Sequence, residues 1–354
     1  MAEKPRHLVN IMKTILIITN SFDLHADLIE PILKQKNQSF FRLNLDKFPK
    51  DYHLKQLYVS GKVEVTIEHL LSKQIIHFED IGAVWNRKPA PFSFISNDLA
   101  PQELAFAKTE TEHTLFGLLY TLDCYWMSHP VNLRGAMWKG EQLNRATQFG
   151  FRIPHSLVTN CPAEVRRFKS LISGDIIFKS LSTPDLASVE VDDDDCIATG
   201  LATTIVTDEL MNNLEAVREI PCHFQEYIPK KYELRVTVVG NSVFAAKLYS
   251  QDDERTKVDS RDMSAEIRYE ATALPDSIHK RCLEFVKSYG LNYSAMDIIV
   301  TPDEDYVFLE NNPNGQFLYI QELIPEFNIL ETVADTLIKN FREDNEQYLR
   351  SAAY

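Results

Sequence analysis

The sequence predicts a mixed α/β fold with more than one domain, and three observations support this prediction. The chain has 354 residues, which exceeds an ordinary domain of about 100 to 200 residues and suggests two or three domains. A β-α-β pattern opens the chain. Two strand–turn–strand patterns in the C-terminal half predict antiparallel hairpins, so parallel and antiparallel sheets are expected in one chain.

The opening β-α-β pattern starts at Thr14 to Thr19, an apolar, β-branched run typical of a strand that is covered on both faces. Apolar residues then recur at helical spacing between Leu24 and Leu33, and SFFRLN at 39–44 predicts the second strand. Further elements are expected after it: strands at 59–67, 75–78 and 82–89, and a helix over 99–122.

Composition and charge exclude several classes of protein. The chain is 44% hydrophobic and 25% charged, as in globular proteins, and its net charge of -14 argues against a broad nucleic-acid or anionic-membrane surface. No run approaches the roughly 20 apolar residues of a membrane span, and the start does not read as a secretory signal. Five scattered cysteines without a CxxC pair indicate neither disulfides nor zinc, so a cytoplasmic location is expected.

The segment 294–317, SAMDIIVTPDEDYVFLENNPNGQF, predicts a β-hairpin that gathers oxygen ligands. Alternation along the strand places Glu310 and Asn312 on one face. If the turn is centred between Asp303 and Glu304, Asp297 lies directly across from Glu310. Two carboxylates and an amide oxygen would suit magnesium shared with phosphates, and the alternative is a hairpin with unrelated surface carboxylates.

A second hairpin is predicted by VVGNSV, with Gly240 and Asn241 at the turn. In that register Glu233 and Arg235 share a face, while Lys247 faces the other way. A glutamate can hold a ribose hydroxyl pair, and an arginine can bind a phosphate through two hydrogen bonds. The alternative is an exposed ion pair that contributes little.

Other patterns carry less information. Lys179 lies in the apolar run IIFKSL, where an ammonium group needs an anion nearby, whereas Lys139 after Trp138 is by position alone an ordinary surface lysine. The run Asp192 to Asp195 is typical of a solvated turn. The sequence contains no Walker A, GxGxxG, GxSxG or HExxH motif.

The order of these motifs resembles the ATP-grasp superfamily along nearly the whole chain. The motifs are Lys139, Lys179, FQEYI at 224–228, ELR at 233–235, Asp297 and ENNPNG at 310–315. Within that superfamily, AVWNRKP, WKGEQL, GFRIPHSLVTN, VDSRD and FLENNPNGQF are similar to the graspetide synthetases, which macrocyclise ribosomally made precursor peptides as in microviridin maturation. Asn311 departs from the pattern, since an apolar residue is common there, and it should point away from the metal.

The resemblance implies roles for particular residues. It implies an ATP-binding set: Lys139 and Lys179 at the phosphates, Gln225, Glu226, Tyr227 and Ile228 around adenine, and Glu233 at the ribose. It also implies a magnesium site and a catalytic residue: Asp297, Glu310 and Asn312 as Mg²⁺ ligands, and Arg235 stabilising the transferring phosphoryl group and the acyl phosphate. Arg87 and Arg261 are candidates for contacting an acidic core peptide, and each is equally compatible with a structural ion pair.

The resemblance also implies a three-lobed ATP-grasp fold with ATP between the second and third lobes. The expected domains are an N-terminal α/β pre-ATP-grasp domain at 1–130, a central lid domain at 131–223, a C-terminal domain with an antiparallel sheet and the metal site at 224–345, and a tail at 346–354. A closing helix is expected from Ile329 to Phe341.

The implied reaction activates a Glu or Asp side chain of the peptide as an acyl phosphate, at the expense of ATP and with Mg²⁺. A Thr or Ser hydroxyl, or a Lys amine, then closes an ω-ester or ω-amide ring. The expected partner is a precursor with a leader and a Thr/Glu-rich core, and a homodimer is suggested. Two alternatives remain open: a ligase for a free amino acid or small peptide, and a nucleotide-binding regulator without turnover.

Overall fold

The computed structural model describes residues 13–182, 203–261 and 264–351, so the acidic run Asp192 to Asp195 lies outside the described residues. Contacts divide the chain into two units. The first comprises Met1–Val131, Leu291–Tyr293 and Asn328–Tyr354, and the second comprises Asn132–Gly290 and Ser294–Phe327. The three-domain division predicted from the sequence stays a prediction.

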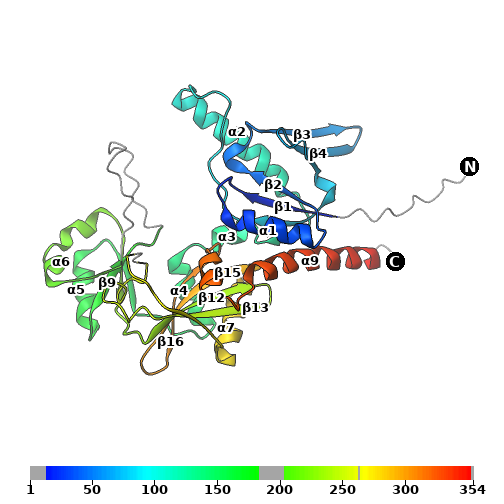
Figure 1. Cartoon of the computed structure of the whole chain (residues 1–354). Helices are drawn as coiled ribbons and strands as arrows, with labels where there is room; N and C mark the ends of the chain where they lie inside the picture. Colours follow the sequence, from blue (N-terminus) through cyan, green and yellow to red (C-terminus); the bar gives the residue numbers. More distant parts are fainter. Residues whose placement is uncertain (1–12, 183–202, 262–263, 352–354) are drawn as a thin grey trace, which may run out of the picture. The chain divides into compact units, whose positions relative to one another are not determined.

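A parallel sheet forms the centre of the first unit (Figure 1). Its order is β2-β1-β6-β7, with β1 paired in parallel to both β2 and β6. The strands are β1 (Thr14–Thr19), β2 (Phe40–Asn44), β6 (Ile81–Asn86) and β7 (Tyr125–Met127). Residues Ile15 to Ile18 are completely buried, which confirms the expectation that the apolar β1 run is covered on both faces.

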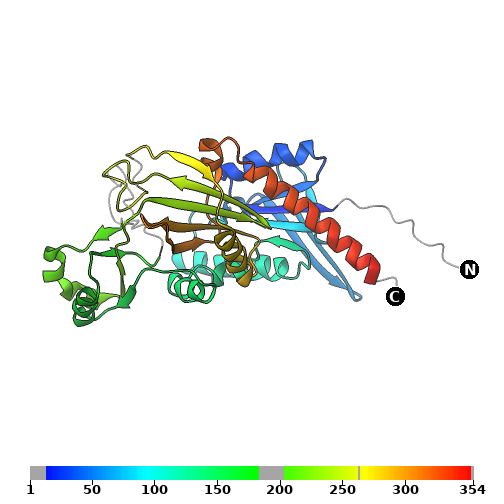
Figure 2. The same cartoon turned by 90° about the horizontal axis from the view of Figure 1, so that it is seen from below.

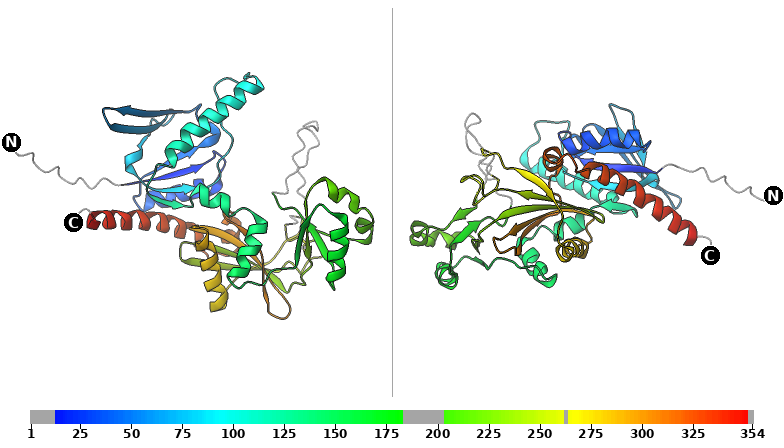
Figure 3. Two further views of the ribbon diagram at one scale, coloured as in Figure 1. Left: turned by 180° about the vertical axis from the view of Figure 1, so that it is seen from behind. Right: turned by 60° about the horizontal axis from the view of Figure 1, so that its bottom comes forward.

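Helices and a small antiparallel sheet cover this parallel sheet. Helices α1 (Leu24–Gln35) and α9 (Ile329–Ser351) contact each other, and α9 also contacts β6 and β7 (Figure 3). Leu16 and Ile18 belong to a core cluster with the C-terminal turns of α2 (Pro101–Leu119) and the small sheet. That sheet has the order β3-β4-β5: β3 (Tyr52–Val59), β4 (Lys62–His69) and β5 (Ile75–His77). Helix α9 continues past Phe341, the expected end of the closing helix, into the predicted tail.

The prediction of one strand over 59–67 was wrong. The chain turns at Ser60 and Gly61, whose φ angles are 52° and 74°, and β4 returns alongside β3. Two consecutive positive φ angles are the geometry of a two-residue hairpin turn. The missed signal was the Ser-Gly pair between alternating polar and apolar residues.

A buried polar cluster joins β1, α1 and the end of β6. Asp23 caps α1, accepts a hydrogen bond from the Thr19 hydroxyl at 2.6 Å, and lies 3.4 Å from the Arg87 guanidinium. Burial opposes ionisation of Asp23, but the hydrogen bond with His25 and the Arg87 charge together lower its pKa. Arg87 is 1% exposed, so this ion pair lies inside the unit.

The second unit contains an antiparallel sheet in the order β10-β9-β11-β8, backed by α5 (Figure 1). Its elements are α3 (Pro130–Gly135), α4 (Lys139–Gln148), β8 (Ser156–Thr159), α5 (Pro162–Leu171), β9 (Ile176–Lys179), β10 (Thr204–Ile205), α6 (Asp208–Asn212) and β11 (Cys222–Glu226). Val165, Ile176 and Phe224 pack in the core between the sheet and α5. The opposite face of the sheet therefore carries Lys179, since strand side chains alternate.

A larger sheet in the order β14-β13-β12-β15-β16 completes the second unit (Figure 2). Its elements are β12 (Tyr232–Val239), β13 (Ser242–Leu248), β14 (Tyr269–Thr272), α7 (Asp276–Ser288), β15 (Tyr293–Val300), β16 (Tyr306–Asn312) and α8 (Leu318–Leu323). Helix α7 packs on β12, and α4 packs on β16. Among the described residues, no helix is long and apolar enough to cross a membrane.

The buried ion pair makes a stability prediction. Asp23→Asn leaves the Arg87 charge inside the unit without this carboxylate, which should destabilise the protein by about 3 kcal/mol. Because the pKa of Asp23 is lowered on folding, its contribution is present in full above the unfolded-state pKa and is lost progressively as pH falls from there through the folded-state pKa, so part of it is lost at pH 3. Urea unfolding at pH 7 and at pH 3 measures both effects. The exposed Asp98→Asn is the control, and equal stability of the two variants would contradict the prediction.

Candidate functional site

The β15–β16 hairpin brings the predicted ligands together, with one irregularity. Near the turn, Ile298 pairs with Phe308 and Val300 with Tyr306, a register that would set Asp297 opposite Leu309 if it continued. The register shifts between Asp297 and Ile298, so Asp297 pairs with Glu310. The predicted pairing is confirmed, but a β-bulge produces it and not the uniform ladder assumed from the sequence.

Three side chains converge at this place. The Asn312 amide nitrogen lies 3.0 Å from Asp297 Oδ2 and 3.3 Å from Glu310 Oε1, and donates to both. Asn311 points away from them: its Oδ1 accepts from the Ser294 hydroxyl at 2.6 Å. Both orientations agree with the strand alternation expected from the sequence.

The predicted second hairpin is confirmed, with Gly240 and Asn241 at the turn between β12 and β13. Gly240 has a φ of 58°, a conformation that favours glycine. Strand β12 neighbours β15, and the Arg235 Nη1 donates to both carboxylate oxygens of Asp297 at 2.9 Å. Arg235 therefore joins the same site.

Two lysines from different elements act on Glu310: Lys139 by contact and Lys179 through its charge. Lys139, the first residue of α4, lies 3.2 Å from Glu310 Oε2 and donates to the Ser180 carbonyl at 3.0 Å. Lys179 ends β9, directly before that carbonyl. The structure thus brings Lys139 and Lys179, which are forty residues apart in sequence, near one carboxylate whose pKa both lower.

The electrostatics follow from these contacts. Burial alone would raise the pKa of Glu310, but the Lys179 and Lys139 ammonium groups outweigh it and lower that pKa. Burial raises the pKa of Asp297, with Arg235 opposing and the Glu310 charge adding to the rise. The two carboxylates titrate as a pair. Burial lowers the pKa of Lys179, an effect that Glu310 opposes and Lys139 and Arg261 reinforce.

The FQEYI segment forms the end of β11 and the following turn. Gln225 is buried and its amide donates to the Ser156 hydroxyl at 3.0 Å. Glu226 accepts from the His155 backbone at 3.1 Å, and Tyr227 donates through its backbone to Asp175. Ile228 is buried against Ile299 and Val307 of the hairpin. These bonds fix the backbone of the segment.

Glu233 is held by three donors. Its Oε1 accepts from Lys230 at 2.9 Å and from the Ser250 hydroxyl at 2.7 Å, and its Oε2 accepts from the Ser260 hydroxyl at 3.2 Å. Glu233 shares the β12 face with Arg235, as predicted. An acceptor that already receives two hydroxyl groups is suited to receive the hydroxyls of a sugar.

The two arginines proposed for an acidic peptide lie in different surroundings. Arg87 belongs to the first unit, buried beside Asp23, so the ion pair left open by sequence reasoning exists. Arg261 is half-exposed in the second unit and bonds Asp259 through Nε at 2.8 Å. The bond to Asp259 chiefly raises the pKa of Arg261, and the charges of Glu310 and Asp297 add to this effect. Its surroundings therefore include the carboxylate pair.

Comparisons with known proteins agree with this geometry. A family model described as the MvdD pre-ATP grasp domain matches residues 14–134. The structure is similar to the Chryseobacterium gregarium RiPP-associated ATP-grasp ligase, solved in complex with ADP and a leader and core peptide, with a TM-score of 0.85, 31% identity, and coverage of 93% of this chain and 97% of that chain. It is also similar to the macrocyclase MdnC of Microcystis aeruginosa MRC, bound with precursor peptide MdnA, with a TM-score of 0.79, 30% identity, and coverage of 92% and 99%. The chain belongs to the graspetide synthetases.

This graspetide synthetase is an ATP-grasp ligase. It shares its fold with the ATP-grasp ligase PsnB, solved with a phosphomimetic variant of minimal precursor, Mg and ADP, at 23% identity and a TM-score of 0.70 over 93% of this chain and 98% of that chain. No curated protein matches the sequence.

The site of the synthetase includes residues that sequence reasoning did not single out. Gln142 of α4 is 2% exposed, and its amide both donates to the Asn311 carbonyl at 2.8 Å and accepts from the Asn311 N–H at 2.9 Å. A β-carbon at Gly315 would lie 2.7 Å from Arg235 Nη2 and 2.9 Å from the Ala295 side chain. Gln142 lies in the sequence motif WKGEQL and Gly315 in ENNPNG, but only the fold shows what these residues contact.

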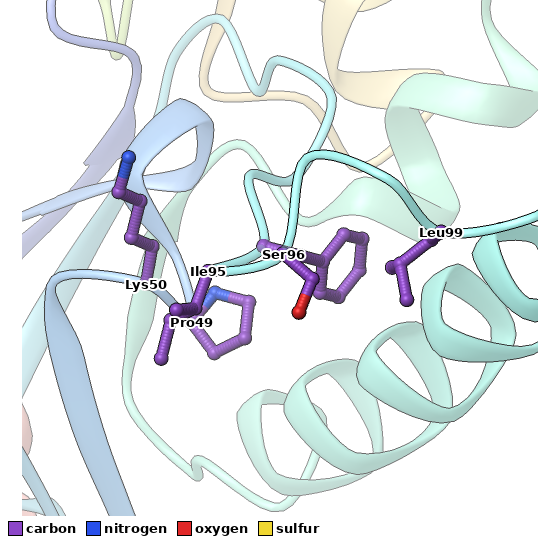
Figure 4. Close-up of a pocket in the computed structure, with 6 residues that line it drawn as sticks. Pro49, Lys50, Ile95, Ser96 and Leu99 are labelled. Atoms are coloured by element: carbon purple, nitrogen blue, oxygen red, sulfur yellow. The ribbon is translucent and has the colours of Figure 1, made fainter.

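A separate hollow lies in the first unit of the synthetase. It measures about 310 Å³ and is lined by Pro49, Lys50, Phe94, Ile95, Ser96 and Leu99 (Figure 4). Its lining is mainly apolar, with the Lys50 amine directed away from the Pro49 and Ile95 side chains. These six lining residues include no carboxylate that could bind a metal ion for phosphoryl transfer.

Gln142 makes the first prediction about the site. Gln142→Met leaves the buried Asn311 N–H and carbonyl without these bonds, which should cost about 2 kcal/mol of stability. Hydrogen exchange of the Asn311 amide should accelerate as well. Gln148→Met, on the exposed side of the same helix, should change stability by less than about 0.5 kcal/mol. Unchanged exchange at Asn311 in the Gln142 variant would contradict this role.

Proposed function

We propose that this ligase closes rings in a ribosomally made precursor peptide, using ATP and Mg²⁺. The observation that carries the proposal is the convergence of Lys139, Lys179 and Arg235 on the carboxylates of Asp297 and Glu310. Positive groups around a carboxylate pair are what phosphoryl transfer from a metal nucleotide requires. Two relatives support the substrate class: one is solved with ADP and a leader and core peptide, and the other with a precursor peptide.

Asp297, Glu310 and Asn312 would hold Mg²⁺. The donor set fits, because two carboxylates and an amide lie within hydrogen-bonding reach of each other, and rotation of the Asn312 amide would turn its oxygen toward the metal in place of its nitrogen. Magnesium usually takes few protein ligands and completes its shell with phosphate oxygens and water. The metal would neutralise charge on the transferring phosphoryl group.

The nucleotide would bind beside this set. Lys139 and Lys179 would contact its phosphates, the backbone of Gln225 to Ile228 would frame adenine, and Glu233 would receive the ribose hydroxyls. The role of Glu233 is supported by the hydrogen bonds that it accepts from the Ser250 and Ser260 hydroxyls, because ribose hydroxyls would donate hydrogen bonds of the same kind. ATP would then span the two sheets of the second unit.

The reaction would have two steps. A Glu or Asp side-chain carboxylate of the peptide attacks the γ-phosphorus of ATP, ADP leaves, and an acyl phosphate forms. Arg235 stabilises the charge on the transferring group. A Thr or Ser oxygen, or a Lys nitrogen, then attacks the acyl carbon, and phosphate departs with the ring closed as an ω-ester or ω-amide. The net change in the peptide is one water lost for each ring.

The peptide would be recognised by charge as well as by its leader. Arg261 is half-exposed near the carboxylate pair and is a candidate for binding an acidic core. Arg87 could bind an acidic side chain of the peptide only if that side chain displaced Asp23 from the Arg87 guanidinium. A Thr/Glu-rich core, a homodimer and a cytoplasmic location are further parts of the proposal.

Mass spectrometry tests the proposed reaction. Incubating the enzyme with a precursor encoded beside its gene, ATP and Mg²⁺ should lower the peptide mass by one water per ring, because each closure joins a carboxyl to a hydroxyl or amine. Omission of Mg²⁺ is the control. If ADP is released only when free amino acids are added, and the precursor mass stays unchanged, the enzyme is instead the small-substrate ligase.

Glu310→Gln tests the metal and phosphate assignments. Losing this charge removes a magnesium ligand and the counter-charge of two lysines, so ring formation should fall at least about a hundredfold. Circular dichroism should show a retained fold. Glu304→Gln, at the exposed turn of the same hairpin, should keep wild-type activity. Wild-type turnover in the Glu310 variant would refute the assignments.

A further inference from the structure

His223 is a further buried side chain of the site, next to Lys179. It belongs to β11, where it pairs with Lys179 of β9 and Val158 of β8. Paired residues share a face, so His223 points to the same side as Lys179, away from the core that contains Phe224. The residue is only 2% exposed.

Both ring nitrogens of His223 are buried, and neither has a hydrogen-bond partner among the residues that the structure describes. A neutral imidazole has one donor and one acceptor, and an unpaired buried polar atom costs about 1 to 3 kcal/mol. Native proteins satisfy the great majority of such atoms. A group that binds at this face would therefore find a donor already in place.

The charges around His223 favour an anion. Burial lowers the pKa of His223 to about 4, and the ammonium groups of Lys179 and Lys139 add to the effect. The imidazole is therefore neutral at physiological pH, beside two cations. It can donate one hydrogen bond to an anion held by those lysines.

We propose that the His223 imidazole donates a hydrogen bond to a phosphate oxygen of the bound nucleotide, beside Lys139 and Lys179. The inference deepens the proposed function and rests on it. Adenine is a poorer partner, because the segment proposed to frame it begins two residues further along the strand, about 7 Å away at about 3.3 Å per residue, whereas Lys179 pairs directly with His223. The positive charges of Lys139 and Lys179 favour the phosphates of the nucleotide, and not its base, at this position.

Calorimetric binding of ADP and of adenosine, each with Mg²⁺, tests this contact. His223→Phe should weaken ADP binding about tenfold, the loss of one hydrogen bond, and leave adenosine binding unchanged because adenosine has no phosphate. His223→Gln, which keeps an N–H donor, should bind ADP more tightly than the Phe variant. His113→Phe, on the exposed part of α2, is the matched control and should bind both ligands as wild type does.

Each outcome decides the inference. Equal ADP affinity in wild type and His223→Phe, or equal losses for ADP and adenosine, would overturn it in favour of a structural role. If the Phe variant does not fold, His223→Met, which also lacks an N–H donor, provides the same comparison between ADP and adenosine, with His223→Gln as the variant that keeps a donor. A wild-type enzyme that does not bind ADP would refute the proposed function itself, whereas tight wild-type binding with an insensitive His223 refutes only this contact.

Discussion

The balance between buried cations and two carboxylates is the constraint on which the site depends. Burial lowers the pKa of Lys179, and the nearby Glu310 charge opposes that effect. Glu310 also lies 3.2 Å from Lys139, and Asp297 lies 2.9 Å from Arg235. Glu310 in turn keeps its negative charge because the two lysine cations are present. A protein with a net charge of -14 thereby concentrates positive charge at one place, where a polyphosphate needs it.

The scaffold holds these charges through contacts distant in sequence. Gln142 connects the helix that carries Lys139 to the backbone of Asn311, the residue between two proposed metal ligands. Asn311 also bonds Ser294 at the start of the neighbouring strand. The polar residue that departs from the expected apolar pattern is therefore part of the support for the site, and an apolar side chain there would leave the Ser294 hydroxyl without this bond.

The sequence allowed prediction of features that depend on local pattern. Strand β1, the Gly240–Asn241 turn and the shared face of Glu233 and Arg235 follow from periodicity and turn residues. Opposition of Asp297 and Glu310 was predicted from a symmetric turn, but it arises from a bulge that no local signal marked. The contact between Gln142 and Asn311 joins residues 169 positions apart, and the burial of His223 depends on two neighbouring strands, so neither was predictable without the fold.

The charged groups of the site pair with one another, which bears on how the substrates would bind. Both Asp297 oxygens accept from Arg235, and Glu233 accepts from Ser250 and Ser260. On the proposed roles, Mg²⁺ at Asp297 would compete with Arg235 for the carboxylate oxygens. Metal and nucleotide therefore exchange existing bonds for new ones, so their net affinity is a difference between two sets of contacts. Arg235 holds Asp297 through Nη1 alone, so its guanidinium would serve both the proposed metal ligand and the phosphoryl group.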